Sequence, residues 1–201
     1  MLVFSISQRV AGFSRSAKQQ EILDVTARQS GHCCEFCGYE SLKNTAIFRD
    51  NNPLNTAPEN LSVVDPLCQA WQQLDTVTAE AGVMIYLPTL QPEDVNHLQR
   101  AIAQALSSED EDYRRDAKDL LDWLTSHDKP VQQAWGTTHP QAFGDALKQL
   151  PTDRRRLLLS RCRHLALALH PGRIVGRLAT TGLDAGTTWW LHLYRDYKAR
   201  S

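Results

Sequence analysis

Two separated cysteine clusters constrain the fold of this chain more than any other sequence feature. The first cluster is Cys34-x-x-Cys37-Gly38, and the second is Asp65-x-x-Cys68. Two thiolates at this spacing can bind one metal ion, and the glycine lets the backbone turn sharply behind the second thiolate. A small, loop-rich segment also gains stability from a bound metal. The sequence therefore predicts a structural zinc site with the ligands Cys34, Cys37, Asp65 and Cys68.

Asp65 has alternative roles that stay open at this point. A carboxylate oxygen is an acceptable zinc ligand, but it is harder than a thiolate. Aspartate also caps helices, so Asp65 can instead serve the backbone while the fourth ligand is lost. His32 and Cys33 lie beside the first cluster and could substitute as ligands.

Composition and charge narrow the class of protein. The 201 residues include 22 Lys and Arg against 23 Asp and Glu, so no overall field favours nucleic acid or an anionic membrane. No apolar run is long enough to span a bilayer, and residues 1–6 lack the features of a secretory signal. Five cysteines, three of them within five residues, are typical of a metal site in a reducing compartment. We therefore expect a cytoplasmic location.

The first part of the chain combines short strands with short helices. Alternation at Leu2, Phe4 and Ile6 predicts a strand, and Ser16 with Gln19 has the spacing of a helix capping box. Further elements are expected as a helix from 17, strands at 45–49 and 82–88, and a helix over 68–74. Residues 1–90 thus read as a zinc-binding region with an HNH-like ββα core.

The second part, residues 91–201, reads as a helical region. Helices are expected to begin at residues 92, 109 and 140, and another is expected to run from Asp153 to about Leu169. Trp189 and Trp190 fall in a last predicted helix, where they suit either an exposed anchor or a lid on the core. The fold class is therefore α+β, with a small zinc-knuckle core followed by a mostly helical C-terminal part.

The two clusters and their surroundings resemble the frame of zinc-containing HNH nucleases. The matching positions are Arg28, Gly31, Cys34, Cys37, Gly38, Asn60, Leu61 and Cys68. The chain departs from the frame at Asp65, where the family has cysteine, and at Gln69, where it has histidine. No histidine lies between Cys33 and Asn96, so the general base of the family has no counterpart there. The resemblance therefore implies the fold of these nucleases without their catalytic activity. We expect Asn60 to stabilise the loop between the clusters through hydrogen bonds.

A longer match resembles the IcmJ/DotN family of type IVB secretion and related conjugation systems. It comprises the degenerate HNH-like knuckle, the strand at 82–88 with Leu90 and Asp94 after it, and the helical continuation. The resemblance implies a non-catalytic adaptor subunit of the cytoplasmic coupling complex, peripheral to the inner membrane. Its partners would be the C-terminal tail of the coupling-protein ATPase and other subunits of that complex. A peptide of the ATPase is expected to dock on the helical region or on an edge strand near residues 83–87.

Two alternatives come from other classes of protein. One is an HNH-type metal-dependent endonuclease with His97 or His139 as an unusual general base. The other is a nucleic-acid-binding module that would use the basic residues between Arg154 and Arg163. The near-neutral net charge argues against the second.

Overall fold

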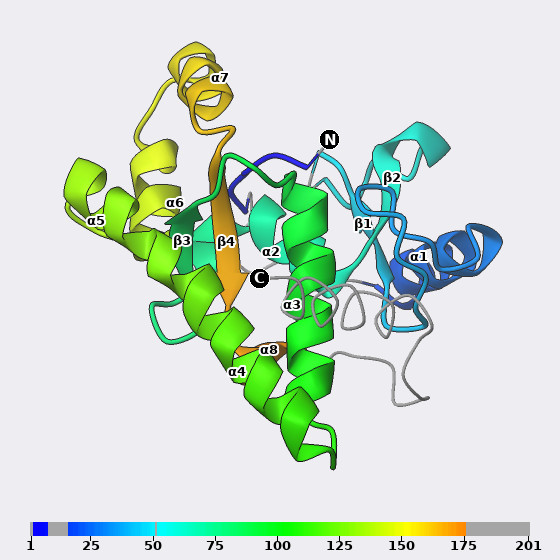
Figure 1. Ribbon diagram of the computed structural model, residues 1–201. Coiled ribbons are helices and arrows are strands. Elements are labelled where there is room, and N and C mark those ends of the chain that lie inside the picture. The colour runs from blue at the N-terminus through cyan, green and yellow to red at the C-terminus, as the bar shows by residue number, and fades with distance from the viewer. Residues whose placement is uncertain (1, 8–15, 51, 176–201) are drawn as a thin grey trace.

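The computed structural model describes residues 2–7, 16–50 and 52–175, and these residues form an α+β fold (Figure 1). The elements in chain order are α1 (Ala17–Gln29), β1 (Thr45–Phe48), β2 (Leu61–Val64), α2 (Pro66–Gln72), β3 (Gly82–Tyr86), α3 (Pro92–Leu106), α4 (Glu111–Thr125), α5 (Lys129–Trp135), α6 (Pro140–Lys148), α7 (Thr152–Arg161), β4 (Leu165–Leu169) and α8 (Pro171–Val175). None of the helices in these ranges is both long and apolar enough to cross a membrane. The predicted last helix, with Trp189 and Trp190, lies outside the described residues.

The first sheet is the antiparallel pair of β1 and β2, with Thr45 opposite Val64 and Phe48 opposite Leu61. Helix α1 packs on this pair through Leu23 in a small apolar cluster. The capping box at the start of α1 is confirmed, because Ser16 and Gln19 exchange hydrogen bonds between side chain and backbone. Helix α2 follows β2 directly, so the expected ββα order is present, although no strand was predicted at residues 61–64.

The second sheet pairs β3 with β4 in antiparallel register, with Gly82 opposite Leu169 and Tyr86 opposite Leu165. The strand predicted after residue 82 is confirmed, but the helix predicted from Asp153 to about Leu169 is wrong in its second half. Helix α7 ends at Arg161 and residues 165–169 form a strand. Every residue of β4 is buried, so its apolar sequence does not show the alternation that identifies a half-exposed strand.

Gly82 is required for close approach of the two strands in this sheet. A Cβ atom at this position would lie 2.7 Å from the carbonyl oxygen of Ala168. We predict that Gly82→Ala destabilises the protein by about 1–3 kcal/mol, because β3 must move away from β4. Thermal unfolding measures the loss, with Ala79→Ser in the exposed preceding turn as the control. A midpoint equal to that of the control would contradict the tight strand contact.

One large hydrophobic core joins the two regions of the chain. It includes Trp71 and Met84 from the first region, and Ile102, Leu124 and Leu167 from the second. Helix α3 contacts α2, α4, β4 and α8, so it lies at the centre of this core. The described parts of residues 1–90 and 91–201 therefore share one sheet and one core. The boundary at residue 90 is a change from mixed to mostly helical structure, and the packing continues across it.

The N-terminal segment contributes buried side chains without joining either sheet. Leu2, Phe4 and Ile6 are buried while Val3 is exposed, so the side chains alternate, but the strand predicted here is wrong because residues 2–7 pair with none of the described strands. Phe4 stacks on Trp71 with ring centroids 4.4 Å apart, and the amide of Ser5 donates to the carbonyl of Trp71. The segment is therefore extended and packed against α2.

The helical part follows the prediction in outline. Helices α3 and α6 begin at Pro92 and Pro140, as predicted. Helix α4 begins later than predicted, because Asp110 caps it by accepting from the amides of Asp112 and Tyr113. Helix α5 was not predicted, since its seven residues are too few to show a clear apolar period.

Candidate metal centre

The first cysteine pair lies in a tight loop between α1 and β1. Gly31 and His32 leave α1 with φ values of 63° and 54°, and Gly38 has φ of 70°. Glycine adopts this left-handed region at little cost, so Gly31 and Gly38 allow both bends of the loop. Between them the amide of Cys34 donates to the carbonyl of Tyr39, and the amide of Gly38 donates to the carbonyl of Cys34. The turn behind Cys37 that the sequence predicted is present.

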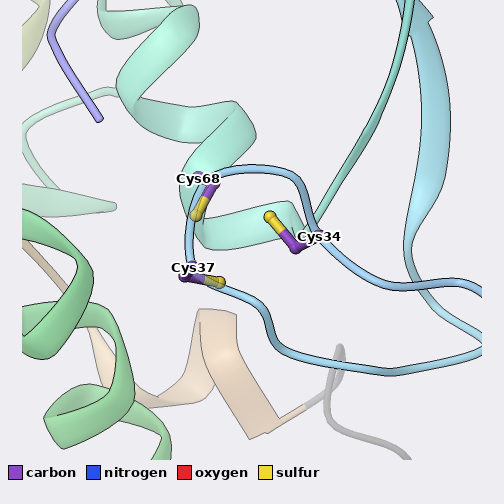
Figure 2. Close-up of side chains that lie close together, drawn as sticks. All are labelled: Cys34, Cys37 and Cys68. Carbon is purple, nitrogen blue, oxygen red and sulfur yellow. The ribbon is translucent and has the colours of Figure 1, made fainter. Parts of the chain in front are cut away.

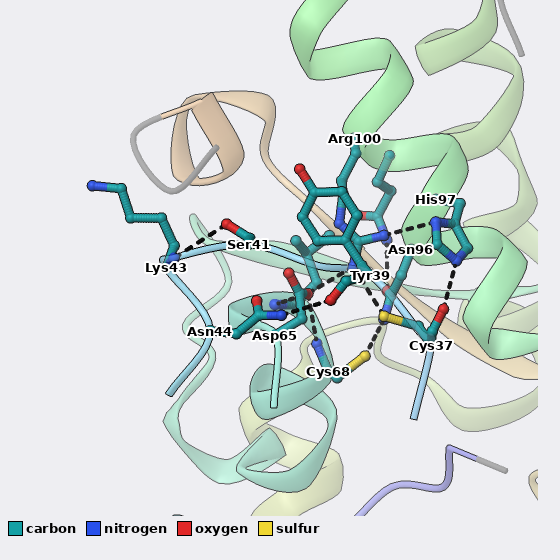
Figure 3. Close-up of polar contacts among 12 residues, drawn as sticks. Cys37, Tyr39, Ser41, Lys43, Asn44, Asp65, Cys68, Asn96, His97 and Arg100 are labelled. Atoms are coloured by element: carbon teal, nitrogen blue, oxygen red, sulfur yellow. Dashed lines mark hydrogen bonds and ion pairs between the residues drawn. The ribbon is translucent and has the colours of Figure 1, made fainter. Parts of the chain in front are cut away.

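Buried side chains fix this loop to the rest of the protein. The amide of Asn44 donates to the carbonyl oxygens of His32 and Tyr39, at 2.7 and 2.6 Å (Figure 3). The backbone amide of Glu35 donates to the carbonyl of Val63 in β2. The position of the loop is therefore set by β2 and by its own side-chain clamp.

The third cysteine, Cys68, lies in the first turn of α2, directly after β2. Asp65 is the N-cap of this helix, and its carboxylate accepts from the amides of Leu67 and Cys68 at 2.8 and 3.4 Å. Pro66 occupies the first helical position, where a missing amide hydrogen costs nothing. The cap thus fixes the first turn of α2, and with it the direction in which the side chain of Cys68 points.

The ligand atoms of Cys34, Cys37 and Cys68 all lie within 4.8 Å of one another. Figure 2 shows the three sulfur atoms pointing toward one another from the loop and from α2. Sulfur atoms that share a tetrahedral zinc at about 2.3 Å are about 3.8 Å apart, so small shifts would bring the three onto one ion. Cys34 and Cys68 are buried, and Cys37 is half-buried. These three residues can hold a metal ion.

The other residues considered as ligands lie outside this group. Asp65, predicted as the fourth ligand, is not in the group of three: its carboxylate caps α2, the alternative role that the sequence left open, and pairs with Arg100. Cys33 directs its sulfur to the carbonyl of Gly38, and His32 is not part of the cluster. Within residues 2–7, 16–50 and 52–175, no other group of His, Cys, Asp and Glu side chains has comparable geometry.

The three thiols are close enough to share protons. Hydrogen bonds from Cys37 and Cys68 lower the pKa of Cys34 to about 2, and the amides of Cys37 and Asp65 assist. The contact with Cys34 raises the pKa of Cys37, and contacts with both other cysteines raise the pKa of Cys68. The shared hydrogen bonds thus favour loss of a proton at Cys34 over loss at Cys37 or Cys68. A divalent ion bound by all three sulfur atoms would displace the remaining thiol protons.

Arg100 of α3 provides positive charge next to the cysteines. Its side chain is only 2% exposed, and its guanidinium lies 2.8 Å from the Asp65 carboxylate. It also donates to the sulfur of Cys37 at 3.3 Å and lies over the ring of Tyr39, 4.1 Å from the centroid (Figure 3). Burial alone would lower the pKa of Arg100, but the charges of Asp65 and Cys37 raise it. The guanidinium therefore stays charged and offsets the anionic groups.

Two further residues of α3 contact the cysteines. The amide nitrogen of Asn96 donates to the sulfur of Cys68 at 3.2 Å, and its oxygen accepts from the indole of Trp71. His97 lies 3.0 Å from the carbonyl oxygen of Cys37 and 3.0 Å from a guanidinium nitrogen of Arg100. Helix α3 thus surrounds the centre with hydrogen bonds, as the outer residues of metal sites commonly do.

These α3 residues were not found as site residues from the sequence, although His97 was considered as a base. The available signal was the spacing of Asn96 and Arg100, which lie four positions apart in the predicted helix. Such a pair shares one helical face, and a buried arginine requires an anionic partner. The sequence alone does not identify that partner as Asp65, because 35 positions separate them along the chain.

The side chain of Asn60 makes the hydrogen bonds that were expected to stabilise the loop between the two cysteine clusters. Its amide oxygen accepts from the amide of Asp50, and its nitrogen donates to the Asp50 carboxylate and to the carbonyl of Asn55. Asn60 is also buried. The predicted structural role of Asn60 is confirmed.

The fold and the centre together define an α+β protein with three cysteines that can hold a metal ion. No protein-family model matches the chain, and no match was found among curated proteins.

Proposed function

We propose that this chain is a non-catalytic adaptor subunit of the coupling complex of a type IVB secretion or related conjugation system. Zinc bound by Cys34, Cys37 and Cys68 would stabilise its fold. In the cell it would bind the C-terminal tail of the coupling-protein ATPase and other subunits at the cytoplasmic face of the inner membrane. The proposal combines the sequence resemblance with the geometry of the cysteine centre.

The proposed structural role of zinc is supported by one observation: the cysteine centre is enclosed between two parts of the chain. The cysteines come from the loop before β1 and from α2, whereas the surrounding side chains of Asn96, His97 and Arg100 come from α3. Three thiolates suit a soft ion such as zinc, and with Zn²⁺ they carry one net negative charge that Arg100 offsets. A zinc ion here would join the N-terminal region to the central helix.

The environment of His97 supports the non-catalytic proposal over a nuclease. An arginine can only donate, so Nδ1 of His97 accepts from Arg100, and the protonated Nε2 donates to the carbonyl of Cys37. Both ring nitrogens are therefore occupied, and neither has a lone pair ready to accept a proton from water. His139, the other histidine considered, precedes α6 and is not in the cysteine cluster.

The direct test is co-purification of the full chain with the C-terminal tail of the coupling-protein ATPase from the same host. We expect the two to elute together from a sizing column, and we expect removal of zinc by a chelator to reduce the complex. Failure to associate when both components are folded would overturn the adaptor role.

A separate assay tests the absence of catalysis. Plasmid DNA incubated with the chain and magnesium, manganese or nickel is expected to remain intact. Cutting that persists through purification and disappears in a His97→Ala variant would assign the chain to the nucleases instead.

A further inference from the structure

A groove of about 780 Å³ lies between α7 and the N-terminal segment. It is also lined by Pro88 and Leu90 of the connection from β3 to α3, and by Pro92, the first residue of α3. The volume is in the range of ligand-binding pockets, about 300–1,000 Å³. None of the polar groups of the cysteine centre lines it, so it is distinct from that site.

The apolar part of the groove has a buried layer and an accessible layer. Leu2 and Trp71 form part of the buried layer and are each 1% exposed. The accessible layer contains Val3, which is 43% exposed, and the half-buried Leu90 and Leu159. A ligand would therefore meet aliphatic side chains and no open aromatic ring.

The charged part of the groove has a single sign. Arg155, Arg156 and Arg163 line it, and the described residues of the lining include no aspartate or glutamate. The neighbouring His164 accepts a hydrogen bond from Nε of Arg163. Arg155 is held by hydrogen bonds to the carbonyl oxygens of Leu147 and Leu150. Arg156 and Arg163 are exposed. Two cationic side chains are thus available to an anionic ligand on an otherwise apolar surface.

We propose that this groove binds an acidic, amphipathic peptide segment of a partner protein. Arg156 lies in α7, whereas Arg163 lies in the turn that follows the end of α7 at Arg161. Two separate cationic side chains on an otherwise apolar surface suit a ligand that carries more than one acidic group, with apolar side chains between them. A peptide with alternating acidic and apolar residues has this pattern, and it would bind through complementary charge and buried aliphatic contacts.

Single-stranded nucleic acid fits the same groove less well. Its bases bind by stacking on exposed aromatic side chains. The aromatic residues of the lining, Phe4 and Trp71, are 5% and 1% exposed and stack on each other. The described residues of the lining therefore offer cations to phosphates but no aromatic surface on which bases could stack.

This inference deepens the proposed adaptor function and rests on it only for the source of the peptide, the tail of the coupling-protein ATPase. The chain also provides a matched control for the test. Arg154 and Arg161 are exposed in α7 and do not line the groove. Reversing either arginine pair changes the net charge equally.

The experiment selects peptides from a random phage-displayed library on the full wild-type chain and measures their affinity for purified variants. We expect selected peptides to combine acidic with apolar residues. Their Kd should rise about tenfold or more in Arg156→Glu/Arg163→Glu and remain nearly unchanged in Arg154→Glu/Arg161→Glu. Val3→Ser, which adds no charge, should weaken binding through the apolar layer, which a purely electrostatic contact would not show. Unfolding midpoints establish that each variant is folded, and Arg156→Gln/Arg163→Gln replaces the charge reversal if it is not.

Selection of neutral or basic peptides, or an equal loss of affinity in both arginine pairs, would overturn the groove as the site. A single-stranded oligonucleotide or anionic vesicles bound more tightly than the peptides through Arg156 and Arg163 would also overturn it. The ATPase tail separates the two proposals. If the tail binds the wild type and the groove variants equally, the adaptor role stands and the groove inference fails. If the tail does not bind while acidic peptides do, the groove stands and the adaptor role fails.

Discussion

Cys68→Ser is expected to abolish stoichiometric zinc binding and to lower the free energy of unfolding by several kcal/mol. Cys68 is fully buried, and its sulfur lies in the group formed with Cys34 and Cys37. Structural zinc contributes roughly 10 kcal/mol of binding free energy in small domains, and most of that appears as folding free energy. Serine oxygen is a poor replacement because zinc in such a site prefers thiolate. Elemental analysis and thermal unfolding of the purified protein measure the two effects.

Cys33→Ser is the matched control for this prediction. Cys33 is a neighbour of Cys34 in the same loop, but its sulfur faces the carbonyl of Gly38 and lies outside the cluster. We expect this variant to keep its zinc and its unfolding midpoint. Unchanged zinc content in Cys68→Ser would refute the metal centre, and equal loss in the two variants would identify Cys33 as an additional ligand.

Arg100→Met is expected to destabilise the protein by about 3–5 kcal/mol. The side chains of Arg100 and Asp65 are 2% and 3% exposed, so removing the guanidinium leaves the carboxylate buried without a counter-charge. The contacts of Arg100 with Cys37 and Tyr39 are lost as well. Chemical denaturation of the wild type and the variant, extrapolated to water, measures the difference.

A double-mutant cycle separates the charge from the other contacts of Arg100. The variant with both Arg100→Met and Asp65→Asn should recover part of the loss, because asparagine still caps α2 and carries no charge. Arg115→Met is the surface control, since its ion pair with Asp112 is exposed and should contribute less than about 1 kcal/mol. A loss for Arg100→Met as small as that of the control would contradict a structural ion pair at the centre.

The elements that the sequence predicted correctly depend on local interactions. The capping box of α1 needs only Ser16 and Gln19, and the starts of α3 and α6 are marked by proline. The pairing of Cys34 with Cys37 follows from their spacing and from Gly38. In each case the residues involved are a few positions apart, so backbone geometry relates them directly.

The errors arose where distant segments compete with local preference. Residues 165–169 continue the leucine-rich composition of α7 and suit a helix, but they form β4 because β3 offers backbone partners and a buried position. Pairing of β3 with β4 joins segments about eighty positions apart in the chain. Tertiary context of this kind routinely overrides helix propensity.

The sequence by itself determined which residues can bind metal, because it contains the thiols of Cys34, Cys37 and Cys68 at spacings typical of a metal site. Only the tertiary structure decided which residues surround these thiols and which charged groups pair with one another. It assigns Asp65 to a helix cap and an ion pair, and it brings Arg100 to the sulfur of Cys37 from 63 positions away. The physical reason is that a buried charge requires an opposite charge close by. Which residue supplies it depends on the packing of the folded chain, so the spacing of residues along the sequence does not predict the pair.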